Sequence, residues 1–543
     1  MIRPAPLAGL AVAVWLAAVL AFGGGYEQRL MALAAAYALM AIGYQLVFGQ
    51  AGALSLAQGA CFAIGAYTAG ILGRLGWPLW AELPATVLVP AALAGLAHLP
   101  VRRLEGHFFA LATLGFAVLV RLVAVDAQGL TGGANGLTGV ATFGRGPLAM
   151  LVGWGVVGLG AALALWLKRG GNGPALALVR GDADLARASG LDPERIRACG
   201  FVLAAGFAGA GGALQAHVLG LISPDVAEFS IMVGCLAMVV IGGRGSVAGA
   251  VVGALLIGHL PEWLRPLGAS YRVAYGVGLF ACLLLAPAGL IGSLERFWRR
   301  GDMPVAAPIE ATPSGATLRI DAVEKSYGGI AVLRGMTLEI RPGEIVGLIG
   351  PNGSGKTTLV NLISGLDRPD GGTIRLGDRR LERLPADRIA LAGVARSFQS
   401  PALPDGMAAL DLVAAALAAK QGCVGFAAAA DLAMLHGGAA ALLGQAPSPD
   451  IARALALDPA ILLLDEPAAG LDAGERARLA LLLRGLADAG RGLLVVEHDM
   501  AFLMGLVDRV AVLLDGRIAL VGTPDQVRAD PAVRAAYLGT APC

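Results

Sequence analysis

The sequence predicts a polytopic α-helical membrane domain followed by an α/β domain, and three observations lead to this prediction. Apolar residues make up 57% of the 543-residue chain and charged residues only 15%, against roughly 25% in soluble domains. The shortage of charge falls mainly in residues 1–300, where apolar runs of near-spanning length follow one another. From Thr317 onward, short strand-like runs alternate with turns and longer helical segments, which is typical of α/β domains.

About ten membrane-spanning helices are expected in the first domain, since a helix needs about 20 residues to cross a bilayer. The apolar runs fall at roughly 7–24, 30–48, 52–73, 84–99, 108–125, 148–167, 198–220, 229–243, 247–260 and 272–292. The eighth and ninth are short and flank Gly242, Gly243 and Gly245, so a broken or re-entrant pair is one interpretation of them. We interpret the first run as a membrane helix and not as a cleaved signal peptide, because its apolar stretch is long for such a peptide.

The basic residues predict which side of the membrane the loops face. Cytoplasmic loops carry an excess of Lys and Arg, and here such residues gather in 100–107, in 168–200 and after the last span. Placing all three on the cytoplasmic side gives ten crossings with both ends of the membrane domain inside. We therefore expect a cytosolic C-terminal domain.

Three segments are predicted along the chain. A membrane domain occupies residues 1–300, a linker rich in Pro, Ala, Ser and Thr occupies 301–316, and the α/β domain occupies 317–543. The net charge of +2 gives no indication of nucleic-acid binding. The six cysteines are scattered without a C-x-x-C pair, which argues against a disulfide framework or a zinc site.

A phosphate-binding loop is predicted at residues 350–357, which read GPNGSGKT and match G-x-x-x-x-G-K-[ST] in full. The motif lies between an apolar strand and a helical segment, which is the context of an α/β P-loop NTPase domain. We expect its glycines to let backbone N–H groups approach nucleotide phosphates, Lys356 to reach the β- and γ-phosphates, and Thr357 to ligate Mg²⁺. The alternative is a glycine-rich turn that matches by chance. The expected nucleotide-binding residues of this loop are Gly350, Asn352, Gly353, Ser354, Gly355, Lys356, Thr357 and Thr358.

Two adjacent carboxylates end the apolar run ILLLDEP at residues 461–467. Ligands of open α/β sheets bind at the carboxyl ends of the strands. Asp465 is therefore expected to hold Mg²⁺. Glu466, pointing the other way on an extended chain, is expected to polarise an attacking water. The alternative is a pair of solvated acids.

Three further residues are assigned by their order relative to these motifs. Gln399, in ARSFQS, is expected to bond both the metal and a water. His498, in LLVVEHD, follows another apolar strand, and Tyr327 precedes the loop and is expected to stack on adenine. Taken singly, a glutamine is usually a surface residue and such a histidine a structural one. The expected catalytic residues are thus Glu466, His498 and Gln399, and the expected metal ligands are Thr357, Gln399 and Asp465.

Together these residues, in this order, resemble the ATP-binding subunit of an ABC transporter over about residues 317–540. The strings GPNGSGKTTLVNLISG, DEPAAGLD and GTPDQVRADPAVRAAYLG are similar to the ATPases of branched-chain amino-acid (Liv-type) importers. The resemblance implies the nucleotide roles argued above. It also implies ATP and Mg²⁺ as ligands, and ATP hydrolysis coupled to transport.

One departure concerns the signature motif of that family, L-S-x-G-Q followed by a basic helix start and IARAL. IARAL is present at 451–455, but the preceding stretch reads ALLGQAPSPD. Gly444 and Gln445 fit, whereas Leu442 occupies the serine position and residues 447–449 replace the basic start. In the family that serine faces the γ-phosphate of the opposite subunit, and leucine cannot bond phosphate. Two interpretations of this departure remain: a weak but working signature motif, or a damaged and non-functional subunit.

Residues 30–295 resemble the Liv-type permease subunit, on the strings LSLAQGACFAIGAYT, TGGANGLTGV and LAMVVIGGRGS and on the block 176–225. Small residues in 200–213 are expected to let helices pack closely, with a transport path as the alternative. The loop 175–199 is expected to form a coupling helix that docks on an ATPase domain near Gln399, the alternative being a solvated loop. Solute contacts are not assigned, and the nearest candidates are Arg121, His217 and His259.

The leading interpretation is a fused permease–ATPase subunit of an ABC importer for branched-chain or related amino acids, in the bacterial inner membrane. The resemblance implies a second permease, a second ATPase and a periplasmic binding protein as partners, besides the lipid bilayer, and no nucleic acid. Urea, short amides or aromatic acids remain alternative cargoes. A non-hydrolysing assembly or regulatory subunit is the alternative from another class.

Overall fold

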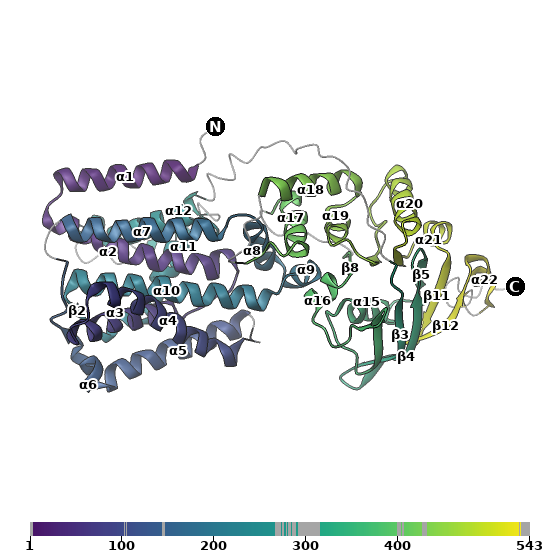
Figure 1. Ribbon diagram of the computed structural model, residues 1–543, viewed down its shortest axis with the longest axis horizontal. Coiled ribbons are helices and arrows are strands. Elements are labelled where there is room, and N and C mark those ends of the chain that lie inside the picture. Colours follow the sequence, from purple (N-terminus) through teal and green to yellow (C-terminus); the bar gives the residue numbers. More distant parts are fainter. Residues whose placement is uncertain are drawn as a thin grey trace. The chain divides into compact units, whose positions relative to one another are not determined.

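The computed structural model divides into two compact units, which are described separately (Figure 1). The residues described are 4–102, 104, 106–143, 147–266, 273, 276, 277, 280, 284, 289–291, 315–398, 403, 407–425, 432–531 and 533. The first unit comprises Met1–Lys168 and Glu194–Asp302, and the second comprises Arg169–Pro193 and Met303–Cys543. Gln399, most of the expected linker and most of the last expected span lie outside the described residues.

Apolar helices build the first unit. Within the described residues they are α1 (Pro4–Phe22), α2 (Gly25–Tyr44) with its π-helical extension η1 (Gln45–Gln50), α3 (Gln58–Arg74), α4 (Leu79–Val101), α5 (Gly106–Asp126), the short α6 (Gln128–Thr131), α7 (Pro147–Leu167), α10 (Pro193–Leu219), α11 (Phe229–Gly242) and α12 (Val247–Leu264).

Six helices in the described part of the chain are long and apolar enough to cross a membrane. They are α2 with its extension, α4, α5, α7, α10 and α12. The apolar part of α1, Leu7–Phe22, and α11 are shorter. The expected number of ten spans therefore stays a prediction.

Glycines of α10 bring neighbouring helices into backbone contact. A Cβ placed on Gly209 would collide with the carbonyl of Thr86 in α4, and one on Gly212 would collide with the carbonyl of Phe62 in α3. On α2, a Cβ at Gly43 would lie 2.6 Å from Phe207 Cβ. Only residues without a side chain permit such approach, as is common between membrane helices. The predicted packing role of residues 200–213 is confirmed.

The two short spans form a tight helical hairpin. Cβ atoms on Gly242 of α11 and on Gly253 of α12 would each collide with a backbone carbonyl of the facing helix. Gly243 turns the chain with φ 120, and Ser246 caps α12 by accepting a hydrogen bond from Gly249 N at 3.2 Å. The interruption predicted at the glycines is therefore a turn between closely packed helices.

Two of the segments that resemble a permease contain short strands, and these strands pair with each other in the first unit. Strands β1 (Leu137–Thr138) and β2 (Leu221–Ile222) are antiparallel, with Leu137 opposite Ile222. Short 3₁₀ turns flank them, η2 (Gly133–Asn135) and η3 (Pro224–Ala227). The TGGANGL segment is thus held to the segment that follows α10.

The second unit contains the α/β domain, with a mostly parallel sheet and an antiparallel sheet. In the described part, the six-stranded sheet has the order β12-β11-β5-β10-β9-β8 and the four-stranded sheet the order β4-β3-β6-β7. The strands are β3 (Leu318–Tyr327), β4 (Ile330–Ile340), β5 (Ile345–Ile349), β6 (Gly371–Leu376), β7 (Arg379–Arg380), β8 (Val394–Arg396), β9 (Ile461–Asp465), β10 (Gly492–Val496), β11 (Arg509–Leu514) and β12 (Arg517–Gly522).

Buried apolar strands explain the central sheet. Every residue of β5, β9 and β10 is buried, as expected for parallel strands covered on both faces. The register places Asp465 opposite Val496, and Val496 opposite Leu348. The carboxyl ends of these three strands therefore lie level. The segments that follow them meet at one edge of the sheet.

Some helices of the second unit pack on these sheets, and others pack on helices. The described helices are α8 (Asn172–Gly181), α9 (Ala183–Ala188), α15 (Lys356–Ser364), α16 (Ala386–Leu391), α17 (Ala409–Lys420), α18 (Leu432–Gln445), α19 (Pro449–Ala456), α20 (Ala473–Asp488), α21 (Met500–Leu506) and α22 (Pro524–Ala529).

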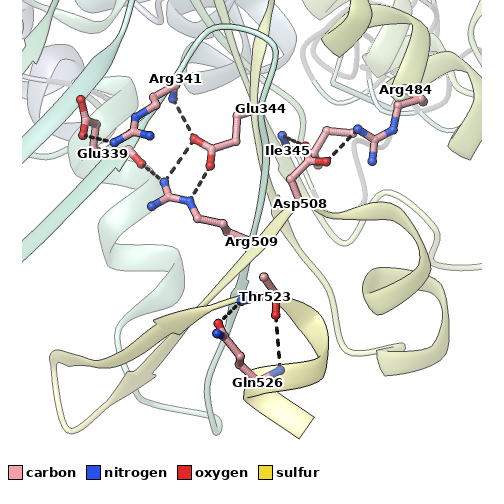
Figure 2. Close-up of polar contacts among 9 residues, drawn as sticks. All are labelled: Glu339, Arg341, Glu344, Ile345, Arg484, Asp508, Arg509, Thr523 and Gln526. Atoms are coloured by element: carbon pink, nitrogen blue, oxygen red, sulfur yellow. Dashed lines mark hydrogen bonds and ion pairs between the residues drawn. The ribbon is translucent and has the colours of Figure 1, made fainter.

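Ion pairs tie the opposite end of the central sheet (Figure 2). Arg509, which begins β11, holds the Glu344 carboxylate with two nitrogens, at 2.5 and 3.1 Å. Asp508 accepts a hydrogen bond from Ile345 N at 2.8 Å and from Arg484 of α20 at 2.9 Å. At the start of α22, Thr523 and Gln526 form a reciprocal capping box. The ion pairs and the bond to Ile345 therefore join the starts of β5 and β11 to each other and to α20.

Candidate nucleotide-binding and hydrolysis site

The glycine-rich loop joins β5 to α15 at the carboxyl edge of the central sheet. Gly353 and Gly355 have φ angles of 83 and 104, which L side chains rarely adopt. A Cβ on Gly355 would also lie 2.8 Å from Leu333 Cδ2, and one on Gly350 would lie 2.5 Å from Ser354 Oγ. Asn352, Gly353 and Thr357 are exposed, so the loop presents its backbone to a ligand.

Lys356 folds back over this loop. Its ammonium donates to the carbonyls of Gly350 at 2.6 Å and Pro351 at 3.1 Å, and the residue is only 8% exposed. Burial lowers the pKa of Lys356, and the nearby carboxylates of Glu466 and Asp465 offset part of that effect. The cation is therefore held close to the acidic pair that the sequence singled out.

Asp465 ends β9 in a buried position, 6% exposed. Burial raises the pKa of its carboxyl, against the opposing influence of Arg396. Arg396 Nη2 lies 3.5 Å from Asp465 Oδ2, and the same guanidinium bonds Asn361 of α15. Sequence reasoning missed Arg396, although it stands in the quoted string ARSFQS. Its partners lie on other elements, and no spacing rule reveals them.

Glu466 faces His498. The distance from His498 Nε2 to Glu466 Oε1 is 3.1 Å, so the structure brings together two of the three predicted catalytic residues. The expected extended backbone at Glu466 is wrong, because its φ is 49. Pairing of β9 ends at Asp465, after which Glu466 N donates to Val496 O at 2.8 Å and Ala469 N donates to Glu466 O. The chain turns at Glu466, and this turn directs its carboxylate.

Glu497 is a buried carboxylate that sequence reasoning also missed. It accepts hydrogen bonds from Ala468 N at 2.8 Å and from His498 N at 3.1 Å. The segment after β9 is thereby tied to the segment after β10. The sequence did contain an indication of this residue, because Glu497 directly precedes His498 in the string VVEHD.

Tyr327 ends β3 with an exposed ring. Its hydroxyl donates to Asp367, and Lys325 Nζ lies 5.0 Å from the ring centroid. The hydrogen bond to Asp367 raises the pKa of Tyr327, while Thr358 of α15 has the opposite influence. The ring thus lies near the helix that follows the loop. Its stacking on adenine stays a prediction.

The residues predicted to hold Mg²⁺ are a hydroxyl, Thr357, and a carboxylate, Asp465, together with Gln399 outside the described residues. Hard oxygen donors of this kind, completed by phosphate and water, suit Mg²⁺. Within the described residues there is no group of three or more His, Cys, Asp or Glu side chains suited to a metal. A hydroxyl and a carboxylate fit an ion that is held jointly with nucleotide phosphates.

A segment of the chain between α7 and α10 packs onto the α/β domain. Within the second unit, α8 packs against α17 and α9 against α16. Asn172 exchanges two hydrogen bonds with Gly425, of 2.8 and 3.2 Å. We call residues 169–193 the docking segment. The predicted docking of this loop on the ATPase domain is confirmed, but the segment that docks is 169–193 and not 175–199, because the residues after Pro193 belong to α10. Its nearness to Gln399 stays a prediction.

Arg453 of α19 is the buried centre of this contact. Its Nη1 donates to Ala188 O at 3.1 Å and lies 3.4 Å from Ser189 Oγ. Its Nε donates to Asp450 at 2.6 Å, and its Nη2 bonds Arg396 O. Asp450 in turn accepts from Phe398 N at 2.7 Å. The docking segment is therefore joined through one guanidinium to the strand end that pairs with Asp465.

Comparison with known proteins follows the same two-part division. The family described as "Branched-chain amino acid transport system / permease component" matches residues 28–287. "ABC transporter" matches 333–469, and "Branched-chain amino acid ATP-binding cassette transporter" matches 520–542. The high-affinity branched-chain amino acid transport ATP-binding protein LivG of Escherichia coli K12 is 37% identical over 250 residues, which are 41% of this chain and 98% of LivG. The chain belongs to the branched-chain amino acid ABC transporters.

Other relatives of this ABC transporter chain match the same half. The branched-chain amino acid transport ATP-binding protein BraF of Pseudomonas aeruginosa is 34% identical over 251 residues, 41% of this chain and 98% of BraF. The lipopolysaccharide export ATP-binding protein LptB of Acidithiobacillus ferridurans is 34% identical, over 41% of this chain and 96% of LptB. A dimeric ATP-binding cassette in a post-hydrolysis state with ADP and Pi is 27% identical, covers 38% of this chain and 98% of that one, and has a TM-score of 0.35.

The ABC transporter chain thus combines a helical permease domain with an ATPase domain whose ATP hydrolysis is coupled to transport. Its altered signature has a structural counterpart. Leu442 lies inside α18, is 6% exposed and belongs to the apolar core. Gly444 and Gln445 end that helix, and a new helix, α19, begins behind Ser448, which accepts from Ile451 N at 3.3 Å. Leucine at this position serves packing.

Proposed function

We propose that this chain is a fused permease–ATPase subunit that imports branched-chain or related amino acids across the bacterial inner membrane, with its ATPase domain in the cytoplasm. The observation that carries the proposal is the coexistence, in one chain, of the permease match at 28–287 and the Glu466–His498 pair beside Lys356. We keep the domain division of 1–300, 301–316 and 317–543, with the docking segment as an excursion from the first domain.

The phosphate-binding residues have defined tasks in this proposal. Backbone N–H groups of the glycine-rich loop and the Lys356 ammonium bind the β- and γ-phosphates of ATP. Thr357, Asp465 and Gln399 hold Mg²⁺, which neutralises charge on the phosphate oxygens when bound. Tyr327 carries an exposed aromatic face for adenine, on the strand β3 beside α15.

Glu466 is the group that orients and polarises the attacking water. A general base must reach the proton it takes, and the turn at Glu466 directs its carboxylate toward the segment after β10. The His498 ring, with Nε2 3.1 Å from Glu466 Oε1, restricts the orientation of that carboxylate. Glu497 positions the histidine by accepting from its backbone N–H. Asp465 and Glu466 therefore divide the work between metal binding and water activation.

Movement in the ATPase domain is passed on through buried polar contacts. Arg396 pairs with Asp465 at the nucleotide edge, and its carbonyl accepts from Arg453, which holds Ala188 of the docking segment. A shift of β8 on ATP binding or hydrolysis would displace these partners together, because buried ionic contacts tolerate little separation. We propose that the docking segment carries this shift to the membrane helices.

The working complex requires more than this chain. We propose a second permease subunit, a second ATPase subunit and a periplasmic solute-binding protein as partners. The two ATPase domains would close around the nucleotides when ATP binds and open after hydrolysis. Closure would drive alternating access of the permease pair.

A second candidate is an asymmetric complex in which this subunit contributes little to its partner's ATP site. The burial of Leu442 favours it, because that side chain packs into the core and offers no hydrogen bond to a phosphate. Replacing Lys356 with Ala here, and separately the equivalent lysine of the second ATPase, tests this in the assembled complex. Unequal loss of ATPase activity supports asymmetry, whereas equal loss argues against it.

The main proposal is tested with the assembled complex in proteoliposomes. Radiolabelled leucine and urea are offered separately, with and without ATP, in the presence of the binding protein. ATP-dependent accumulation of leucine supports the proposal, and accumulation of urea alone contradicts the cargo. Accumulation that persists when Asp465 and Glu466 are both neutralised contradicts the mechanism.

A further inference from the structure

The exposed ring of Tyr327 is held by side chains from other parts of the ATPase domain. Its hydroxyl donates a hydrogen bond to Asp367, which lies after the end of α15. The side chain of Thr358, in the first turn of α15, also interacts with this hydroxyl. Tyr327 itself ends β3. The ring is therefore tied to the helix that begins at the glycine-rich loop.

Asp367 is itself fixed by several hydrogen bonds. Its Oδ1 accepts from Lys325 Nζ at 2.9 Å and from Arg368 N at 2.7 Å, while its Oδ2 accepts from the Tyr327 hydroxyl. Its backbone N–H donates to Asn361 O of α15 at 3.3 Å. Burial acts to raise the pKa of this carboxyl, but the bonds from Tyr327, Lys325 and Arg368 N outweigh it and lower the pKa. The acceptor is thus a carboxylate, and hydrogen bonds to charged groups are about twice as strong as neutral ones.

Lys325 completes the arrangement on one face of the ring. This lysine is buried, and its ammonium lies 5.0 Å from the centroid of the Tyr327 ring. The ammonium also donates to Arg368 O at 2.7 Å and lies 3.6 Å from Asp370. A cation in this position is attracted to the face of an aromatic ring. Tyr327 nevertheless remains 46% exposed, so a ligand approaches from the opposite face.

A ring that is fixed in advance binds a stacking ligand better than a mobile ring does. A ligand that stacks on a mobile side chain must immobilise it, which weakens binding by about 2- to 10-fold. Stacking uses the face of the ring and leaves its hydroxyl to other partners. The hydrogen bond to Asp367 can therefore hold the ring before the ligand arrives and while it is bound.

We propose that Asp367 is a positioning residue for the nucleotide base: its carboxylate anchors the Tyr327 hydroxyl, so that the ring presents its free face to adenine. The inference rests on the proposed stacking of Tyr327 on adenine and adds the residue that orients the ring. Asp367 has no task at the phosphates or at Mg²⁺. A triphosphate without a base is therefore insensitive to this residue.

Photolabelling of the assembled complex with an ATP analogue that carries an azide on its adenine tests the proposal. Electrophoresis separates the labelled permease–ATPase chain from its partner subunits, so the concentration for half-maximal labelling reports the affinity of this chain's own site. Displacement of the analogue by tripolyphosphate reports the phosphate contacts alone. Asp367→Ala should raise the half-maximal concentration about 2- to 10-fold and leave the affinity for tripolyphosphate unchanged. Asp367→Asn retains an oxygen acceptor and should lose less.

Three further variants serve as controls. Tyr327→Phe removes the hydroxyl but leaves the Lys325–Asp367 ion pair intact, so it should match Asp367→Ala without disturbing the fold. Tyr327→Phe combined with Asp367→Ala should bind no more weakly than either single variant, since both remove the same hydrogen bond. Asp321→Asn changes another exposed carboxylate of β3 and should behave like the wild type. Lys356→Ala should weaken both the azide analogue and tripolyphosphate.

Three results overturn the inference. The first is an Asp367→Ala variant that labels like the wild type. The second is an equal loss of affinity for the analogue and for tripolyphosphate, which would assign Asp367 to the general structure of the site. The third is a double variant whose loss is the product of the two single losses, because the two residues would then act separately.

Failure of the proposed function gives a different pattern. Tyr327→Ala should raise the half-maximal concentration by about 10- to 100-fold, the factor expected for loss of one base stacked on an aromatic ring. If it does so while Asp367→Ala has no effect, adenine stacking stands and the role of Asp367 fails. If Tyr327→Ala labels like the wild type, adenine does not stack there and the inference fails with it. If Lys356→Ala changes neither affinity, the proposed phosphate site is wrong.

Discussion

The Arg453 guanidinium donates a hydrogen bond of 3.1 Å to the backbone carbonyl of Ala188, across 265 positions of sequence. Arg453 is fully buried, and it also holds Asp450 and the carbonyl of Arg396. Since Arg396 pairs with Asp465, a continuous series of polar contacts joins the docking segment to the nucleotide edge of the sheet. This arrangement leads to the first two predictions.

Replacing Arg453 with Met should destabilise the ATPase domain by about 3–5 kcal/mol, because the Asp450 carboxylate is left buried without its partner. Thermal unfolding of the purified complex, followed for that domain, measures the loss. The matched double variant Arg453→Met with Asp450→Leu removes both charges and should recover part of the stability. A single variant as stable as the wild type would contradict the burial argument.

Replacing Gly190 with Ala should uncouple ATP hydrolysis from transport. Gly190 has φ 78, and an added Cβ would lie 2.8 Å from Leu391 Cδ2 of α16, so either the Leu391 side chain or the docking segment must shift. Backbone strain alone contributes about 1–2 kcal/mol. Gly422→Ala is the control, because Gly422 has φ 67 but a Cβ there meets nothing within 4 Å. We expect fewer leucine molecules transported per ATP hydrolysed in the first variant only.

Replacing Glu466 with Gln should reduce ATP turnover by about 10²–10⁴-fold, since the proposed general base is lost while the glycine-rich loop is intact. His498→Ala should reduce ATP turnover by about 10- to 100-fold, because the side chain that lies 3.1 Å from the Glu466 carboxylate no longer positions it. Steady-state ATPase assays should show these effects in kcat, with ATP binding changed little. If the double variant, Glu466→Gln with His498→Ala, has the same kcat as Glu466→Gln alone, the histidine acts through the glutamate.

As the pH rises, the affinity for ATP should begin to fall at a lower pH than it would with a lysine of ordinary pKa. Burial lowers the pKa of Lys356 from the usual value of about 10.4, so the amine loses its proton earlier as the pH rises. A neutral amine does not attract phosphate, and affinity therefore falls as pH increases through that pKa. Titration of the complex with a fluorescent ATP analogue between roughly pH 8 and 10 checks this.

The variant Lys356→Arg provides the control for the pH dependence. A guanidinium stays protonated throughout this range, so affinity should be weaker overall but nearly independent of pH. An alkaline decline of equal size in the variant would assign the effect to another group.

Local sequence patterns predicted the elements of the site well. The strand 345–349, the glycine-rich loop and the strand that ends at Asp465 all lie where apolar runs and turn residues indicated. They were predictable because a buried parallel strand reads as a continuous apolar run. Strands β3 and β4 form an irregular antiparallel hairpin that includes polar residues, and an apolar pattern alone does not indicate its full length.

Residues that act through distant partners were not predictable in this way. Arg396, Glu497 and Arg453 owe their positions to contacts with other elements, and their sequence neighbours give no sign of those contacts. The backbone of Glu466 departs from the extended form for a similar reason, because its N–H is bound by Val496 of the next strand. Leu442 marked a changed motif, but only the structure shows it as part of the core.

The docking segment and the ATPase domain are parts of one polypeptide, so their association is unimolecular. The equilibrium constant of their association does not depend on protein concentration. Dilution or detergent extraction can separate independent subunits, but it cannot separate these two parts of one chain. A cell therefore cannot alter the ratio of this permease to its own ATPase by adjusting expression. Regulation of transport by this chain can therefore act on its conformation but not on that ratio.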